Sequence, residues 1–365
     1  MEFQVDKDAP MPLYVQIFQR IFEKIQDGSL EPRTLLPAEE TLAEKIGVHR
    51  FTVRHAYKML EEKGLVTRFR AKGTYVRSVP PGNNKLIALL GPALVRGSNL
   101  DMIQDMVGLL YKKGYNVLLC DTMSDFSRQH NYIEMIIDKM ASGVIFIPIE
   151  NNELYHKNLE SINILKRKGI PVIQLDRYVD AENTDYIVTD NERGAYILTK
   201  YLLKKGHKRI GFIKSALSSS MLDRLKGYQQ ALIEYGIKPD DNLIKFFSEL
   251  GANNTVMVDF FLKMEDPPTA LFIIFDFIAV FTVNSLKEKG VKVPDDMEIV
   301  CFDNFWTSVF HIPVTSMVKP WAEMAERAIE LLLKRIEYGT IEEPINMVLE
   351  SKLVGGNVAE LNNQA

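Results

Sequence analysis

The chain has 365 residues, of which 46% are hydrophobic, and its formal net charge is −4. This length exceeds one small module, so it predicts two or three domains with enough apolar material for folded cores. No run of about 18 apolar residues occurs, and the N-terminus MEFQVDKDAPMP lacks a basic region followed by an apolar stretch. The sequence therefore predicts neither a membrane span nor a secretory signal, and we expect a cytoplasmic protein.

The cysteine and histidine content gives no sign of a metal or cofactor site. Cys120 and Cys301 both lie in apolar, strand-like runs, VLLCDT and EIVCFDN, which predicts core packing with a disulfide or metal pair as the minor alternative. The six histidines show no metal-ligand spacing. We therefore expect a protein without metal or cofactor.

The chain begins with a loose tail, residues 1–11, followed by a helix. Leu13, Ile17, Ile21 and Ile25 recur every four residues and predict one apolar helical face, which ends before a glycine. Residues 29–37 are predicted to be a proline-bearing connector.

Two short amphipathic helices follow, separated by Gly47. The first covers 39–46, and the second places Val53, Tyr57 and Leu60 at i, i+4 and i+7 on one face. The opposite face of the second helix is polar and presents Arg50, Thr52, Arg54, His55 and Lys58.

A basic hairpin is predicted directly after these helices. Residues 65–70 and 74–76 have strand character, and the basic side chains near their connection are Arg68, Arg70 and Lys72. Residues 44–77 hold nine Lys and Arg against three Asp and Glu, so positive charge is local in an acidic chain. A helix fits the major groove, and Lys and Arg neutralise phosphates, so the pattern predicts a winged helix-turn-helix that binds DNA. The alternative is the charged face of an ordinary exposed helix, and the basic hairpin favours DNA.

Residues 10–77 resemble the GntR family of bacterial transcription regulators. The motifs are Leu36-Pro37-Ala38-Glu39, Val48-His49-Arg50-Phe51-Thr52-Val53-Arg54, Leu60-Glu61-Glu62-Lys63-Gly64-Leu65-Val66 and Lys72-Gly73-Thr74-Tyr75-Val76. The resemblance implies that Glu39, Arg50, Thr52, Arg54 and Gly73 lie at the DNA. His49 stands where the family usually has serine as helix N-cap, and histidine is a weaker cap. With the hairpin, the expected DNA-binding residues are Glu39, His49, Arg50, Thr52, Arg54, Arg68, Arg70, Lys72 and Gly73.

Residues 78–85, SVPPGNNK, form the predicted linker between a DNA-binding domain at 1–77 and a second domain at 86–365. Beyond the linker, short apolar strands alternate with longer helical patterns, which predicts parallel sheets covered by helices. About 280 residues exceed one doubly wound unit, so two lobes are expected. The predicted strands are 86–90, 117–121, 144–148, 172–175, 186–189, 209–213, 271–274 and 298–302. The overall prediction is an α/β protein with an N-terminal winged helix-turn-helix.

Polar residues follow several predicted strands, where ligands bind in parallel α/β sheets. Carboxylates, arginine and amides in such positions suit a polyhydroxylated ligand, because Asp accepts from hydroxyls and Arg donates in a fixed fork. A single Asp of this kind more often caps a helix, but several at equivalent strand ends favour a site. The candidates are Ser98, Asn99, Asp125, Asp176, Arg177, Arg224 (expected to open a helix), Asp276 and Asp303.

Residues 86 to about 355 resemble the effector domain of the LacI/GalR repressors, itself similar to periplasmic sugar-binding proteins. The matching stretches include Pro171-Val172-Ile173-Gln174-Leu175-Asp176-Arg177, Lys205-Gly206-His207-Lys208-Arg209-Ile210-Gly211-Phe212 and Arg224-Leu225-Lys226-Gly227-Tyr228. The resemblance implies ligand contacts from Asp176, Arg224 and Asp303. Phe275 stands where the family often has asparagine, and its ring adds a stacking surface, which makes Phe275 a further candidate ligand contact. A GntR-like head on such a domain is similar to the arrangement of arabinose repressors, which makes L-arabinose or another pentose or deoxyhexose the expected effector.

Together these patterns predict a homodimeric repressor that binds double-stranded operator DNA and is released by a small sugar. A transport receptor is disfavoured by the DNA-binding head. The alternative is an enzyme that acts on a sugar or sugar phosphate and carries a fused DNA-binding head, because the fold supports many chemistries. The sequence contains no GxSxG, GxxxxGK[ST] or HExxH motif, and we therefore expect no catalytic activity.

Overall fold

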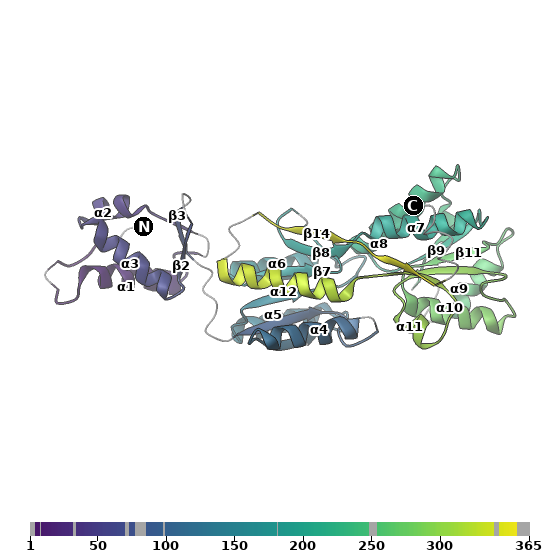
Figure 1. Cartoon of the computed structure of the whole chain (residues 1–365), viewed down its shortest axis with the longest axis horizontal. Helices are drawn as coiled ribbons and strands as arrows, with labels where there is room; N and C mark the ends of the chain where they lie inside the picture. Colours follow the sequence, from purple (N-terminus) through teal and green to yellow (C-terminus); the bar gives the residue numbers. More distant parts are fainter. Residues whose placement is uncertain are drawn as a thin grey trace.

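The computed structural model describes residues 4–7, 9–31, 34–69, 73–76, 85–97, 99–180, 182–247, 254–338 and 343–355. Figure 1 shows an N-terminal unit at one end of the molecule, followed by two α/β lobes. We call these the head, lobe 1 and lobe 2. The predicted fold class is confirmed, with two parallel-type sheets covered by helices.

The head contains three helices and a small antiparallel sheet, with α1 (Leu13–Gln26), β1 (Leu35–Leu36), α2 (Glu39–Ile46), α3 (Arg50–Glu62), β2 (Val66–Phe69) and β3 (Gly73–Val76). The apolar faces predicted from spacing pack together, with Ile17, Ile21 and Val53 fully buried. Gly47 adopts φ +69 between α2 and α3, a left-handed conformation that favours glycine and makes the sharp turn. The predicted helices and hairpin are confirmed, although residues 70–72 lie outside the described residues.

The prediction of a connector at 29–37 was incomplete. Leu35 and Leu36 form β1, which pairs antiparallel with Tyr75 and Thr74 of β3. A two-residue strand has no periodicity of its own, because only its pairing with a distant strand defines it.

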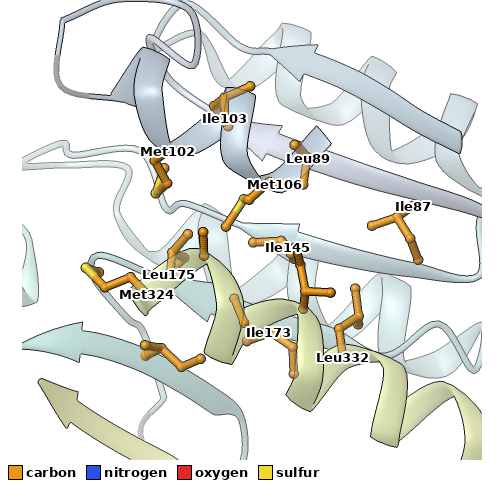
Figure 2. Close-up of a cluster of buried hydrophobic side chains, with 14 of the residues drawn as sticks. Ile87, Leu89, Met102, Ile103, Met106, Ile145, Ile173, Leu175, Met324 and Leu332 are labelled. Atoms are coloured by element: carbon orange, nitrogen blue, oxygen red, sulfur yellow. The ribbon is translucent and has the colours of Figure 1, made fainter. Parts of the chain in front are cut away.

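Lobe 1 is built on six parallel strands in the order β14-β8-β7-β6-β4-β5. The strands are β4 (Leu86–Gly91), β5 (Asn116–Asp121), β6 (Gly143–Phe146), β7 (Val172–Leu175), β8 (Asp185–Thr189) and β14 (Asn346–Leu349). One face carries α4 (Asn99–Lys112) and α12 (Trp321–Tyr338), and the other carries α5 (Phe126–Asp138) and α6 (His156–Arg167). Figure 2 shows Met106 of α4 and Leu332 of α12 packed with Ile145 and Ile173 of the strands.

Lobe 2 has a sheet in the order β10-β9-β11-β12-β13-β15, in which β15 is antiparallel to β13. Its strands are β9 (Ile210–Lys214), β10 (Ile244–Phe246), β11 (Ala270–Ile273), β12 (Glu298–Phe302), β13 (Thr315–Val318) and β15 (Lys352–Val354). Helices α7 (Asn191–Lys204) and α8 (Ser219–Glu234) cover one face, while α9 (Asn254–Leu262) and α10 (Asp276–Glu288) cover the other. The short α11 (Phe305–Val309) follows β12.

The chain passes between the lobes three times. It crosses from β8 to α7, returns from β13 to α12, and crosses again from β14 to β15. These crossings place the carboxyl ends of the parallel strands of both lobes toward the junction between the lobes. The expected linker, residues 78–85, lies outside the described residues except for Lys85, whose carbonyl accepts from the Asn116 N–H at 2.6 Å.

Within the described residues, no helix combines the length and apolar content needed to cross a bilayer. The same part of the chain holds no grouping of three or more His, Cys, Asp or Glu side chains suited to a metal ion. Cys120 and Cys301 are free and buried, which confirms the expected core packing.

Candidate DNA interface and interlobe ligand site

The polar face of α3 is the centre of the candidate DNA interface. Its arginines remain accessible, with the side chains of Arg50 and Arg54 exposed by 47% and 45%. His49 is the N-cap of this helix, and its Nδ1 accepts from the Phe51 N–H at 3.4 Å. This long contact fits the expectation that histidine caps a helix more weakly than serine.

Glu39 joins arginines from two elements of the head. Its Oε2 accepts from Nε of Arg54 at 3.1 Å, and its Oε1 lies 3.0 Å from Nη2 of Arg68 on β2. Arg50 Nε lies 3.6 Å from the same carboxylate. A carboxylate between several guanidinium groups fixes their geometry in the absence of DNA. Glu39 therefore positions the cationic side chains of the recognition helix and the hairpin.

Phe51 is a surface feature that the sequence pattern missed. Its ring is 63% exposed at the start of α3, stacks on His49 at 5.3 Å and lies 5.5 Å from the guanidinium carbon of Arg54. An apolar side chain in this position can contact a thymine methyl group. The available signal was that position 51 lies off the buried face of Val53 and Tyr57.

The remaining predicted DNA contacts have mixed outcomes. Thr52 is half-buried on α3. Gly73 begins β3 with φ +110, and a Cβ there would lie 2.7 Å from Leu35 Cδ1, so the strand geometry requires glycine. Arg70 and Lys72 lie outside the described residues.

The candidate interlobe ligand site consists of Asp176, Arg177, Arg224, Asp276, Asp303 and Lys319. Asp176 follows β7 of lobe 1, whereas Asp276 begins α10 after β11, and Asp303 follows β12, both in lobe 2. All six residues are buried. Five of the predicted residues therefore lie together, although Arg224 comes from within α8 (Ser219–Glu234) and not from a strand end. Lys319 is the member that the sequence analysis missed.

Arg224 and Asp303 carry hydrogen-bonding atoms that have no partner among the described residues. Arg224 is fully buried; its Nε donates to Asn191 Oδ1 at 2.8 Å and its Nη1 donates to the Ile274 carbonyl at 2.7 Å. Its Nη2 is buried without a partner, as is Oδ1 of Asp303. Burial, only partly offset by Asp303, lowers the pKa of Arg224, which nevertheless remains a cation. Such atoms are costly unless something fills their hydrogen-bonding capacity.

Aromatic rings surround the guanidinium group. Its carbon lies 3.7 Å from the ring centroid of Phe302 and 5.5 Å from that of Phe275. Phe275 therefore lies beside the site as predicted. The prediction that Arg224 opens its helix was wrong, because α8 begins at Ser219 with Ser218 as N-cap.

Asp176 is held by cations on both oxygens. Its Oδ1 accepts from Lys319 Nζ at 2.7 Å, and its Oδ2 accepts from Arg177 Nη2 at 2.8 Å. Burial alone would raise the pKa of Asp176, but Lys319 and Arg177 hold that pKa well below its usual range. Arg177 also contacts Glu150 at 2.8 Å, a residue that the sequence analysis did not select.

Asp276 has the opposite electrostatic setting. Burial, together with the nearby Asp303 carboxylate, raises its pKa to about 6. Its Oδ2 accepts the backbone N–H of Trp306 at 2.8 Å and so fixes the start of α11. Trp306 in turn packs on the β4–α4 loop of lobe 1, where a Cβ on Gly97 would lie 2.8 Å from Nε1 of the indole.

Three predicted ligand residues are not brought into this cluster. Asp125 is exposed and caps α5, where its carboxylate accepts from the N–H groups of Ser127 and Arg128. The helix-cap alternative therefore explains Asp125, and we leave it out of the site. Asn99 begins α4, and its side chain donates to the Ala93 carbonyl at 3.1 Å, so it stabilises its own loop. Ser98 lies outside the described residues.

Hydrogen bonds connect the lobes beside the site. The Leu217 N–H donates to Asn152 Oδ1 at 3.0 Å, and the Tyr178 N–H donates to Ser219 Oγ at 2.9 Å. Ser218 Oγ also donates to Glu150 at 3.1 Å. The site residues are therefore enclosed between lobes that touch each other.

Comparisons with known proteins agree with both halves of this description. Residues 13–76 match the gntR family of bacterial regulatory proteins, and residues 199–356 match the periplasmic binding protein-like domain. An arabinose metabolism transcriptional repressor of Geobacillus stearothermophilus is 27% identical over 96% of this chain and 98% of its own length. The HTH-type transcriptional repressor PurR of Aliivibrio salmonicida is 28% identical over 73% of this chain and 79% of its own length.

The same fold occurs in a solved structure. The complex of the transcriptional regulator CelR with cellobiose aligns with a TM-score of 0.65 and 22% identity, over 87% of this chain and 98% of that one. The chain is thus a transcription regulator whose head matches the gntR family of bacterial regulatory proteins and whose second part matches the periplasmic binding protein-like domain.

Proposed function

We propose that this regulator is a repressor whose effector is a small neutral polyhydroxyl compound, a sugar, bound between the lobes. The observation that carries the proposal is a pair of buried atoms, Nη2 of Arg224 and Oδ1 of Asp303, for which the described residues supply no hydrogen-bond partner. One is a donor and the other an acceptor, and a hydroxyl group can satisfy either. Phe275 and Phe302 add apolar ring faces beside the guanidinium group, against which the C–H groups of a sugar can pack.

The charges of the site favour a neutral ligand over an anionic one. The carboxylates of Asp176, Asp303 and Glu150 are balanced by the cations of Lys319, Arg177 and Arg224, and most of these groups already contact an opposite charge. Asp276 adds a further acidic group. A sugar phosphate or sugar acid would bring uncompensated negative charge into a buried site, which is costly.

In the head, we propose that Arg50, Arg54 and Arg68 contact operator DNA, with Glu39 holding them in place and Gly73 shaping the hairpin. Arg70 and Lys72 are proposed to add phosphate contacts, and His49 and Thr52 to lie at the same surface. A homodimer would place two copies of α3 on a palindromic operator in the cytoplasm. Sugar binding between the lobes would change how the dimer presents its heads, a coupling of about 1–3 kcal/mol. The proposed domain boundaries are 1–77 and 86–365.

The first experiment is a thermal-shift screen of the whole chain with neutral monosaccharides, beginning with L-arabinose. A ligand at 100 times its Kd stabilises the folded state by about 2.7 kcal/mol. Sugar phosphates and sugar acids form the comparison arms, and we expect them to give no shift. Both tryptophans of the chain lie near the site, Trp306 against the Gly97 loop and Trp321 under Lys319, so intrinsic fluorescence should follow the same titration.

A second experiment links the effector to DNA. Operator duplexes are selected from a random library by the whole chain, and the neutral sugar that gives a thermal shift is added to the complex. Release of the duplex supports the proposal, whereas tighter binding would make the sugar a co-repressor. Turnover of any sugar or sugar phosphate in the same mixtures would revive the enzyme alternative, and a thermal shift caused only by anionic compounds would overturn the proposed effector class.

A further inference from the structure

Lys319 lies on the second crossing of the chain between the lobes. It follows β13 of lobe 2 and precedes α12 of lobe 1, and the residue is only 5% exposed. Its ammonium lies 2.7 Å from Asp176 Oδ1 in lobe 1 and 3.4 Å from Asp303 Oδ2 in lobe 2. It also lies 4.5 Å from the ring centroid of Trp321. Lysine is rarely buried unless it is paired, and the carboxylates of Asp176 and Asp303 provide this pairing.

We propose that Lys319 is an internal counter-ion that holds the two lobes together by bridging Asp176 and Asp303. Without the ammonium, two buried carboxylates from opposite lobes would face each other, and like charges in a buried site repel strongly. With the ammonium, closing the lobes brings opposite charges together. Lobe closure therefore has a contribution from the chain itself, separate from any effector.

The arrangement also positions Asp303 for ligand binding. Lys319 contacts Oδ2 and leaves Oδ1 without a partner among the described residues. Lys319 is thus a positioning residue, because its contact with Oδ2 orients the Asp303 carboxylate. The contact of Lys319 with both lobes forms without an effector, so a sugar screen that gives no ligand would leave the proposed bridge intact.

The test measures backbone hydrogen exchange by mass spectrometry in the whole chain with no sugar added. The peptides of interest contain Leu217 and Tyr178, whose N–H groups donate across the lobe junction. In Lys319→Met we expect at least tenfold faster exchange in these peptides, while peptides from the central strands β6 and β11 exchange as in the wild type. Exchange in both junction peptides at the wild-type rate would overturn the proposal.

A matched control removes a lysine–carboxylate pair that lies within one lobe. Lys205 contacts Glu298 at 2.5 Å, and both residues belong to lobe 2. Lys205→Met should leave exchange at the junction unchanged; acceleration equal to that of Lys319→Met would show that loss of any such pair opens the lobes.

Two further variants separate the charge from general packing. Lys319→Gln keeps a hydrogen-bond donor but removes the charge, and it should also accelerate exchange; it serves as the test if Lys319→Met does not fold. Adding Asp303→Asn to Lys319→Met removes one of the facing negative charges and should slow junction exchange again by at least threefold. A purely structural role for Lys319 would give no such rescue, and its absence would count against the counter-ion.

Discussion

The two lobes end equivalent strands with an aspartate, yet the two aspartates have different surroundings. Asp176 after β7 and Asp303 after β12 have φ values of +68 and +66, and each donates its backbone N–H to the neighbouring strand, at 3.0 Å and 2.9 Å. Both oxygens of Asp176 bind cations, whereas Oδ1 of Asp303 has no partner among the described residues. Backbone position therefore identifies both strand ends, but it does not show that the Asp176 carboxylate is already saturated by cations while the Asp303 carboxylate keeps one oxygen for the proposed ligand.

The largest expected effect is the loss of stability when Asp176, whose two oxygens both bind cations, is replaced. Asp176→Ala leaves the buried cations Lys319 and Arg177 without a shared carboxylate, and breaking a buried ion pair in this way costs about 3–5 kcal/mol. Urea unfolding should show this loss, while Asp303→Ala should lose less than half as much. Equal losses for the two variants would remove the proposed difference between the lobes.

The raised pKa of Asp276 predicts how the stability of the protein depends on pH. The folded-state pKa of about 6 lies above the ordinary aspartate pKa of 3.8, so the contribution of Asp276 to stability is present below pH 3.8 and is lost as pH rises through 6. Asp276→Asn has no carboxylate to ionise, so it should be more stable than the wild type at pH 8. The expected difference in the free energy of unfolding is about 3 kcal/mol, because a pKa difference of one corresponds to about 1.4 kcal/mol.

The difference in stability between Asp276→Asn and the wild type should shrink toward zero as pH falls to 4. Urea unfolding at several pH values gives the comparison. A difference that stays constant with pH would mean that Asp276 is not the group that titrates.

Asp303→Asn tests whether the Asp303 carboxylate contacts the effector. The amide has nearly the same shape as the carboxylate but loses the charged acceptor, and hydrogen bonds to charged groups contribute about 1.5–3 kcal/mol. The effector found in the thermal-shift screen should bind roughly 10- to 100-fold more weakly, with operator affinity unchanged.

Asp266→Asn is the control for this variant, because Asp266 is an exposed carboxylate of lobe 2 that pairs with Arg209. It should bind the effector as the wild type does. If Asp303→Asn responds at the wild-type effector concentration, the ligand site lies elsewhere.

The head offers a third carboxylate for the comparison, because Glu39 is saturated by arginines in the same way as Asp176. Arg54→Ala should weaken binding to the selected operator roughly 10- to 100-fold, as expected for loss of one specific contact of about 1–3 kcal/mol. Arg20→Ala, on α1 and paired with Glu23, is the matched control and should change little. Equal operator affinity for both variants would exclude Arg54 from the interface.

Local pattern predicted much of this molecule. Apolar spacing identified α1, α2 and α3, and strand–helix alternation identified both lobes, because these features repeat within a few residues. The strand-end rule identified Asp176, Asp276 and Asp303, because each lies directly after an apolar strand that can be recognised in the sequence. Asp125 failed the rule because an aspartate before a helix has a local use as an N-cap, and that local use is the one the structure shows.

What the sequence missed depends on long-range contacts. Lys319 appears in the sequence as one lysine before a proline, and its partner Asp176 lies 143 residues away. The short strands β1, β13 and β15 are defined by pairing with distant strands rather than by their own composition. Neither the burial of a lysine nor the point where the chain crosses between lobes has a local signature.

The three crossings also set the order in which the protein can be completed during synthesis. The head ends at β3, before lobe 1 begins, and all of its strands and helices are contiguous. Lobe 1, by contrast, needs α12 to cover one face and β14 to complete its sheet, and both come from the last part of the chain. A growing polypeptide therefore carries a finished DNA-binding head long before either lobe is complete, and a product that stops early would hold the head without the completed lobes.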